Sequence, residues 1–290
     1  MNELAEWDIV TGVGITALAV AAGRSIETNR DDALAADPYA EAFVEAAAPP
    51  MPMPTRLEDV DDIEKSWTWL ADYIGVRTRY FDDYFAEASR AGIDQMVLLA
   101  AGLDVRAYRL DWPTGTTVYE LDAPKVLAFK DDVLAVEKAG PRADRRALAV
   151  DLREDWAVPL QNKGFDRSKP SAWLAEGLLP FLPNAAKERL FQFVTDLSAP
   201  GSRLELEHVD DAQAMLQEDQ FQQLSERFGI DMAALWPEED DLHPVEWLRD
   251  HGWEVEIAYS REVAERFGRP LLNPDGGPSR SSEFITAVRV

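Results

Sequence analysis

Between residues 94 and 209, short β-rich runs alternate with segments that mostly have a helical pattern. This alternation is typical of βαβ units, in which successive strands lie parallel and a helix carries the chain back. The five runs are residues 94–102, 116–122, 145–151, 171–179 and 202–209. Two later runs, 253–260 and 283–290, bring the predicted strands to seven. We therefore expect a doubly wound α/β sheet.

The residues outside this alternation are predicted to be mainly helical. In residues 61–90, large apolar side chains recur mostly at spacings of three, four and seven, so one face of this helix is expected to be buried. We interpret residues 1–92 as a helical N-terminal cap and residues 93–290 as the core. Residues 210–250 are polar and longer than a usual crossover, which predicts a late helical insertion that covers the site.

The apolar stretch "IVTGVGITALAVAA" at residues 9–22 is the strongest candidate for a targeting or membrane segment. Acidic residues precede it, whereas a secretory signal carries basic ones. At about 14 residues it is also shorter than the roughly 20 that span a bilayer. We interpret it as a core or lid helix.

Charge and cysteine content narrow the function classes. The chain carries 29 Lys plus Arg against 54 Asp plus Glu, a formal net charge of −25. Such a charge repels phosphate backbones and anionic lipids, so neither nucleic acid nor a membrane is an expected partner, whereas a cationic ligand is compatible. The chain has no cysteine, which excludes thiol chemistry and suits a cytoplasmic protein. The oligomeric state is left open.

Four successive predicted strands end in acidic residues. In open α/β sheets the ligand binds beyond the carboxyl ends of the strands, so these residues are expected to meet at one edge. A single acid there is usually a helix cap, but four together, two of them beside a glycine, favour a ligand site. The residues are Gly102 with Asp104, Asp122, Asp151 with Leu152, and Glu176 with Gly177.

The spacing favours a nucleoside without a diphosphate. Asp122 follows Gly102 by about twenty residues, a position from which an acid accepts both hydroxyls of a ribose. The first loop reads A-A-G-L-D-V in place of G-x-G-x-x-G, so a pyrophosphate is disfavoured. The Tyr-x-x-x-Lys pair of short-chain dehydrogenases is also missing. S-adenosylmethionine contains adenosine, no phosphate and a cationic sulfonium, and suits an acidic pocket better.

Several segments together resemble one family. They are "VRTRYFDDYF" (76–85), "VLLAAGLDVRAYRLDWP" (97–113), "TVYELDAPKVLAFK" (117–130), "AVDLREDW" (149–156) and "AWLAEGLLPFLP" (172–183). The chain is similar to actinobacterial S-adenosylmethionine-dependent methyltransferases related to leucine carboxyl methyltransferase. The resemblance covers nearly the whole chain. It implies a seven-stranded, Rossmann-like methyltransferase core and O-methylation of a carboxyl or hydroxyl group on a small-molecule acceptor.

The resemblance also assigns roles to residues. It implies that Asp122 binds the ribose, and that Asp151 and Leu152 flank the adenine. Gly102 would lie against the methionine part, with Asp104 nearby, and Glu176 under the sulfonium end. Arg77, or its neighbour Arg79, would pair with the methionine carboxylate. One departure is Ala100-Ala101-Gly102 where many methyltransferases have Gly-x-Gly, which leaves less room near Ala100.

The catalytic residues are not identified by the sequence. A carboxylate acceptor needs no general base, whereas a hydroxyl acceptor would benefit from one, and His208 at the end of the fifth run is the best-placed histidine. His243 and His251 are interpreted as structural. Asp210 and Asp211 adjoin His208, but no His or Cys lies at ligand spacing, so no metal is predicted. Two alternatives stay open: a non-catalytic cofactor-binding domain of this fold, and an NAD-dependent oxidoreductase.

Overall fold

The structure is a computed structural model of the 290-residue chain. It describes residues 9–10, 12–49, 51–60, 65–209, 222, 225, 235–236, 242–272 and 282–290. Most of the predicted insertion at residues 210–250 therefore lies outside the described residues.

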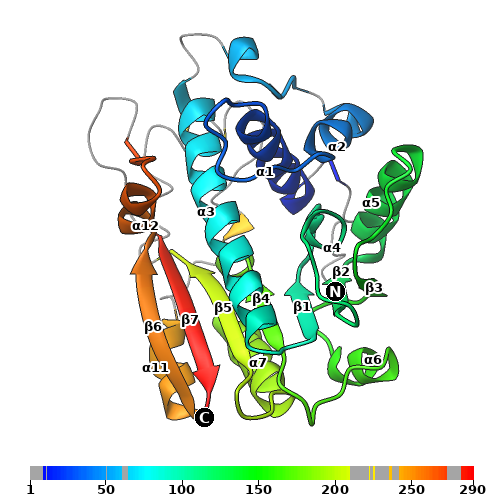
Figure 1. Cartoon of the computed structure of the whole chain (residues 1–290), viewed down its shortest axis with the longest axis vertical. Coiled ribbons are helices and arrows are strands. Elements are labelled where there is room, and N and C mark those ends of the chain that lie inside the picture. Colours follow the sequence, from blue (N-terminus) through cyan, green and yellow to red (C-terminus); the bar gives the residue numbers. More distant parts are fainter. Residues whose placement is uncertain are drawn as a thin grey trace.

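A single seven-stranded sheet forms the centre of the molecule (Figure 1). Its strands lie in the order β3-β2-β1-β4-β5-β7-β6. Strands β1 to β5 are parallel, and β7 runs antiparallel to both β5 and β6. The bounds are β1 Gln95–Leu99, β2 Thr117–Asp122, β3 Asp144–Ala149, β4 Ala172–Ala175, β5 Arg203–His208, β6 Trp253–Tyr259 and β7 Glu283–Arg289. The predicted doubly wound α/β sheet is confirmed.

The predicted strand runs are longer than the strands. The fourth run, 171–179, extends past the end of β4 at Ala175 because the residues Leu178 and Leu179 are apolar and buried yet belong to a turn. The third run likewise extends past Ala149, where β3 ends. Burial of apolar side chains therefore marks the strands but not their last residues.

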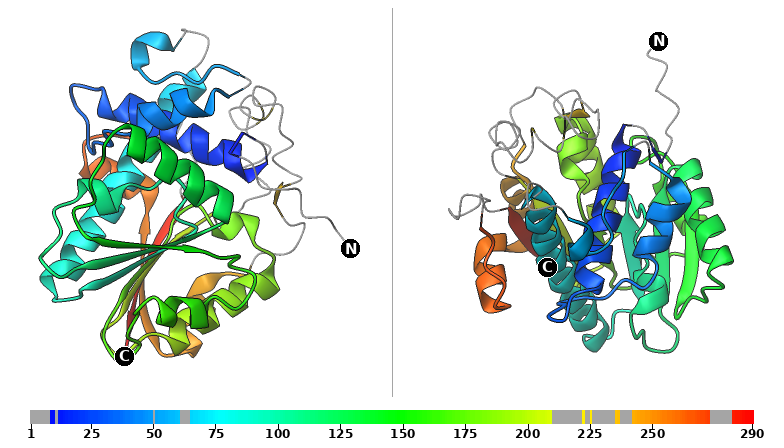
Figure 2. Two further views of the ribbon diagram at one scale, coloured as in Figure 1. Left: turned by 90° about the vertical axis from the view of Figure 1, so that its right-hand side faces the viewer. Right: turned by 90° about the horizontal axis from the view of Figure 1, so that it is seen from above.

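Alternation along the strands divides the core between the two faces of the sheet. On β1, Met96 and Leu98 pack into one hydrophobic cluster, while Val97 and Leu99 pack into the other. This is the two-residue period of a strand that is buried on both sides. The helices therefore lie in two layers, one on each face (Figure 2).

The N-terminal helices lie over the first face of the sheet. Side chains of α1 and α3 share one cluster with side chains of β1, β2 and β4, so the predicted cap has a core in common with the sheet. The second face is covered by α6, α7 and α11. The helices are α1 Val13–Thr28, α2 Ala40–Ala47, α3 Lys65–Arg90, α4 Arg106–Arg109, α5 Pro124–Val136, α6 Ala157–Asn162, α7 Asn184–Asp196, α11 Pro244–Asp250 and α12 Ser260–Arg266, with 3-10 turns at Leu57–Asp59 and Leu179–Phe181.

The long helix α3 crosses the front of the sheet in Figure 1. Its residues Trp67, Ile74, Phe81 and Phe85 are fully buried, as their spacing predicts. Residues 13–22 of the apolar stretch form the first part of α1, whose Leu18 and Ala22 are buried in the same cluster. Within the described ranges, no helix is both long and apolar enough to cross a membrane.

One carboxyl group is buried between α3 and the sheet. Glu205 on β5 is 1% exposed and accepts a hydrogen bond of 2.8 Å from the Thr286 hydroxyl on β7. Within the described part of the chain, its second oxygen, Oε1, has no hydrogen-bond partner. Burial raises the pKa of Glu205 from about 4.5 to about 8, against the smaller effect of the Thr286 hydrogen bond. The carboxyl group is therefore mostly protonated at neutral pH.

Glu205 makes the stability of the fold depend on pH. Because its folded pKa lies above its unfolded value, this group lowers the free energy of unfolding as the pH rises from about 4.5 to about 8. Glu205→Gln has no carboxyl group to titrate. From pH 5 to pH 8, the free energy of unfolding of the variant should therefore rise by roughly 3 kcal/mol relative to that of the wild type. Urea unfolding at both pH values measures this difference. The control is Glu256→Gln, an exposed carboxyl on β6. The prediction is contradicted if the free energies of unfolding of the wild type and Glu205→Gln differ by the same amount at pH 5 and at pH 8.

Candidate active site

The candidate site lies at the carboxyl ends of the parallel strands. The chain continues from β1 to β2 on one side, whereas β4 lies on the other side of β1, so the strand order reverses between β1 and β4. Ligands of open α/β sheets bind at such a point. The segments after β1 and β4, the carboxyl ends of β2 and β5, and helix α3 supply the residues described below.

The loop after β1 leaves open space beside its glycine. Ala101 N–H donates to the Leu121 carbonyl at 3.0 Å, which fixes the loop against β2. Gly102 has φ +50°, and a Cβ added there would meet only the Ala100 carbonyl oxygen at 3.9 Å. Ala100 also has a positive φ of 54°, a conformation that non-glycine residues rarely adopt. The backbone at Gly102 is thus accessible to a ligand.

Asp122, the last residue of β2, links this loop to the second strand. Its carboxylate accepts hydrogen bonds of 2.6 Å from the backbone N–H of Gly102 and from that of Ala123. The residue is 8% exposed, and this burial raises its pKa although both backbone hydrogen bonds lower it. Each oxygen holds one of these bonds and retains capacity for a second donor.

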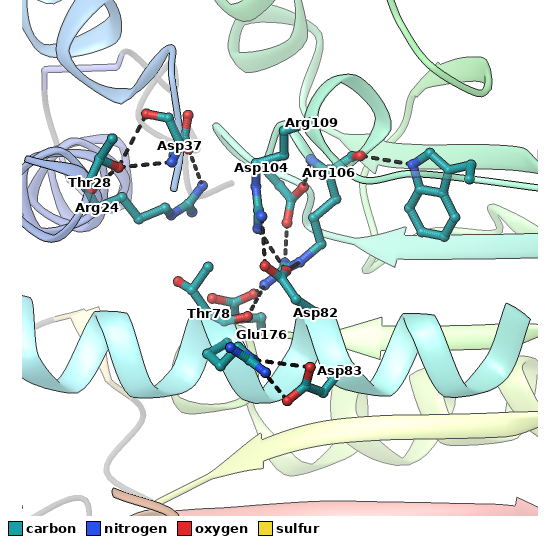
Figure 3. A network of polar contacts seen from close by, with 12 residues as sticks. Arg24, Thr28, Asp37, Thr78, Asp82, Asp83, Asp104, Arg106, Arg109 and Glu176 are labelled. Atoms are coloured by element: carbon teal, nitrogen blue, oxygen red, sulfur yellow. Dashed lines mark hydrogen bonds and ion pairs between the residues drawn. The ribbon is translucent and has the colours of Figure 1, made fainter. Parts of the chain in front are cut away.

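The guanidinium of Arg106 is the centre of a network of carboxylates (Figure 3). It pairs with Asp104 in its own loop, with Glu176 after β4 at 2.8 Å, and with Asp82 on α3 at 2.7 Å. The Arg106 side chain is only 2% exposed. Arg109 also pairs with Asp82, at 2.6 Å. The network therefore fixes two strand ends to the helical layer.

A second guanidinium, that of Arg77 on α3, continues the network toward β5. Its Nη1 lies 2.9 Å from a Glu207 carboxylate oxygen, and its Nε lies 2.9 Å from Glu176 Oε1. Glu207 also accepts hydrogen bonds from the Tyr73 hydroxyl and, at 2.7 Å, from Gly177 N–H. Glu207 thereby holds the glycine turn after β4 in place.

The charges of this cluster favour ionised carboxylates. Burial opposes ionisation of Glu176, but Arg106 and Arg77 outweigh it and lower its pKa to about 2. The pKa of Asp104 is lowered in the same way, chiefly by Arg106 against the effect of burial. Four carboxylates, those of Asp82, Asp104, Glu176 and Glu207, pair with the three guanidiniums of Arg77, Arg106 and Arg109. The surplus of negative charge suits a cationic ligand.

Five of the seven residues predicted from the sequence lie in or beside this cluster. They are Arg77, Gly102, Asp104, Asp122 and Glu176.

The other two predicted residues, Asp151 and Leu152, follow β3. Asp151 is exposed and pairs with Arg153 at 2.6 Å. The contacts of Asp151 with an adenine stay a prediction. Of the two candidate arginines on α3, Arg77 reaches the site, whereas Arg79 is on the surface and pairs with Asp83 at 2.9 Å.

Sequence reasoning missed several residues of the cluster, among them Arg106, Glu207 and Tyr73. Arg106 follows Asp104 by two positions, and an arginine so close to an acid after a buried strand was the available signal. Glu207 belongs to the run "LELEHV", in which two glutamates alternate with leucines on a predicted buried strand. Tyr73 lay among many aromatic residues of a helix, so no sequence signal separated it from core packing.

Comparison with known proteins identifies the family. The family model described as leucine carboxyl methyltransferase matches residues 17–195. A protein of Mycobacteroides abscessus, named as a predicted S-adenosyl-L-methionine-dependent methyltransferase, is 47% identical over 300 residues, covering 98% of each chain. A protein of Saccharopolyspora erythraea with the same description is 46% identical over 289 residues, covering 100% of each chain.

Solved structures share the fold at low identity. A DUF574 family protein of Streptomyces avermitilis has a TM-score of 0.56 and 13% identity, covering 93% of this chain and 97% of its own. A predicted methyltransferase of Thermobifida fusca has a TM-score of 0.53 and 18% identity, and the match covers 93% of this chain and 94% of the Thermobifida chain. The class is thus that of the S-adenosylmethionine-dependent methyltransferases. Within it, the chain belongs to the leucine carboxyl methyltransferase family, as the sequence motifs predict.

The buried network should make Arg106 important for stability. Arg106→Lys keeps a positive charge but loses the planar fork that reaches three carboxylates. We expect the free energy of unfolding to fall by about 2–4 kcal/mol, because carboxylates are left buried with an incomplete partner. Arg79→Lys, in an exposed pair on the neighbouring helix, is the control and should change stability by less than about 1 kcal/mol. Equal effects of the two substitutions in denaturant unfolding would refute this role.

Proposed function

We propose that this chain transfers the methyl group of S-adenosylmethionine to a carboxyl or hydroxyl oxygen of a small molecule. The observation that carries the proposal is the buried Asp122 carboxylate, held by the Gly102 and Ala123 N–H groups at the carboxyl edge of the sheet. Membership of the leucine carboxyl methyltransferase family supports the reaction class.

The residues at this edge fit S-adenosylmethionine. Asp122 has free acceptor capacity for ribose hydroxyls, and the open backbone at Gly102 leaves room for a ligand. Glu176 Oε1 is buried and forms an ion pair with Arg77 Nε, and no described residue gives it a hydrogen bond of good geometry. When bound, the cofactor would supply an electrophilic methyl group on a cationic sulfur.

Each residue then has a role in binding. Asp122 accepts the ribose hydroxyls, and Glu176 places negative charge at the sulfonium end. Arg77 attracts the methionine carboxylate while Glu176 and Glu207 keep its guanidinium oriented. Asp151 and Leu152 are assigned to the adenine.

The protein's contribution to the rate is chiefly positioning. Methyl transfer from a sulfonium is a direct displacement, so the acceptor oxygen has to be aligned with the methyl group and shielded from water. A carboxylate acceptor is already ionised near neutral pH and needs no base. For a hydroxyl acceptor, His208 at the end of β5 is the base that we propose.

Asp122→Asn tests the cofactor site. The substitution removes the negative charge and leaves one acceptor oxygen for two backbone donors and a ribose. We expect the dissociation constant for S-adenosylmethionine to rise by roughly 10- to 100-fold, equivalent to about 1.5–3 kcal/mol for hydrogen bonds to a charged group. Isothermal titration of the wild type and the variant measures this change.

The matched control is Asp144→Asn, an exposed aspartate at the opposite end of the sheet, where β3 begins. It should bind like the wild type. Equal binding by all three proteins would reject the assignment of Asp122, and a folded wild type that binds no S-adenosylmethionine would reject the function. Cofactor binding with no methylated product across carboxylic acids, phenols and alcohols would favour the non-catalytic alternative.

A further inference from the structure

Two of the three histidines of the chain lie close to a buried carboxylate where β5 ends and β7 begins. His208 is the last residue of β5, and Glu283, the first residue of β7, lies opposite it in the antiparallel register. His243 immediately precedes α11. One donor atom from each residue lies within 4.8 Å of the other two.

We infer that His208, His243 and Glu283 form a binding site for a divalent transition-metal ion such as Zn²⁺. Two imidazoles with one carboxylate form a donor set that zinc and similar ions prefer, whereas Mg²⁺ and Ca²⁺ select oxygen ligands. The inference rests on these three residues and does not depend on the proposed methyl transfer, although a His208 that binds an ion would not also act as the base proposed above for a hydroxyl acceptor.

The spacing of the donors is close to that of a metal site. His243 Nε2 lies 3.1 Å from Glu283 Oε2. Two ligands that each lie about 2.1 Å from a tetrahedral zinc ion are themselves about 3.4 Å apart. The rings of His208 and His243 are inclined by 69°, with centroids 4.7 Å apart. Only small side-chain movements are therefore needed for the three to bind one ion.

Two of the three residues are buried, and the third is partly exposed. His208 and Glu283 are 2% and 5% exposed and stand on paired strands, so their positions are fixed by the sheet. The His243 side chain is 34% exposed, which leaves a path for an ion. A cation at this point would also offset the cost of burying the Glu283 carboxylate. Three protein ligands leave a further position of the ion open.

Metal binding requires the proton on His243 to be redistributed. The Val245 N–H lies 3.4 Å from Nδ1 of His243, so in the neutral ring the proton is on Nε2 and faces Glu283. For Nε2 to bind an ion, the neutral ring has to carry its proton on Nδ1: the Nε2 proton leaves and Nδ1 takes one up, so the ring stays neutral. The contact with Val245 that is then lost is longer than a normal hydrogen bond, so its loss costs little.

Zinc titration of the full-length protein, with any affinity tag removed, tests the inference. His243 and His251 flank the same helix α11, and His251 instead stacks on Trp247 with ring centroids 3.7 Å apart. His243→Ala is therefore the test variant and His251→Ala the matched control. Isothermal titration with Zn²⁺ measures stoichiometry and affinity, and Mg²⁺ reports binding to the acidic surface. Circular dichroism shows whether each variant is folded.

We expect the wild type and His251→Ala to bind one Zn²⁺ ion with equal affinity. Substitutions in the outer shell of metal sites weaken binding by roughly 10- to 100-fold, so losing a ligand in His243→Ala should weaken it by at least about 100-fold. Glu283→Gln, which keeps the shape of the side chain, should weaken it as well. Absence of one-to-one Zn²⁺ binding in the wild type, or equal affinity in the wild type and His243→Ala, would overturn the inference.

Discussion

The geometry of the site depends on the ion pairs that the buried guanidinium of Arg106 forms with its carboxylate partners. A cation in the interior costs several kcal/mol unless carboxylates surround it, so the partners of Arg106 have to be brought to it when the chain folds. These partners are Asp104 after β1, Glu176 after β4 and Asp82 on α3. One side chain thus connects the two strands at the switch point with the helix that covers them.

The rest of the carboxyl edge follows from this arrangement. With Glu176 held by Arg106, its other oxygen meets Arg77, which in turn binds Glu207. Glu207 then positions the Gly177 N–H. On the other side of β1, Asp122 orders the loop at Gly102 in a similar way. The polar groups are therefore oriented before a cofactor binds, which lowers the cost of binding it.

Much of this fold could be predicted from the sequence, because parallel strands and crossover helices have different hydrophobic periods. The acids at strand ends were found for the same reason: once a strand is recognised, the residue after it belongs to the ligand edge. Partnerships across the fold could not be predicted. The pairing of Arg77 with Glu207 depends on how α3 crosses β5, and the contact of His208 with His243 depends on where α11 begins. Neither contact has a spacing signature.

The central claim is that the acidic residues at the ends of β1, β2 and β4 form the S-adenosylmethionine site. A crystal structure of the protein with S-adenosylhomocysteine, the demethylated cofactor, tests it most directly. The account predicts ribose hydroxyls on Asp122, the amino-acid portion beside Gly102 and Arg77, and the sulfur toward Glu176. A ligand bound away from this edge, or a ribose that Asp122 does not contact, would contradict it.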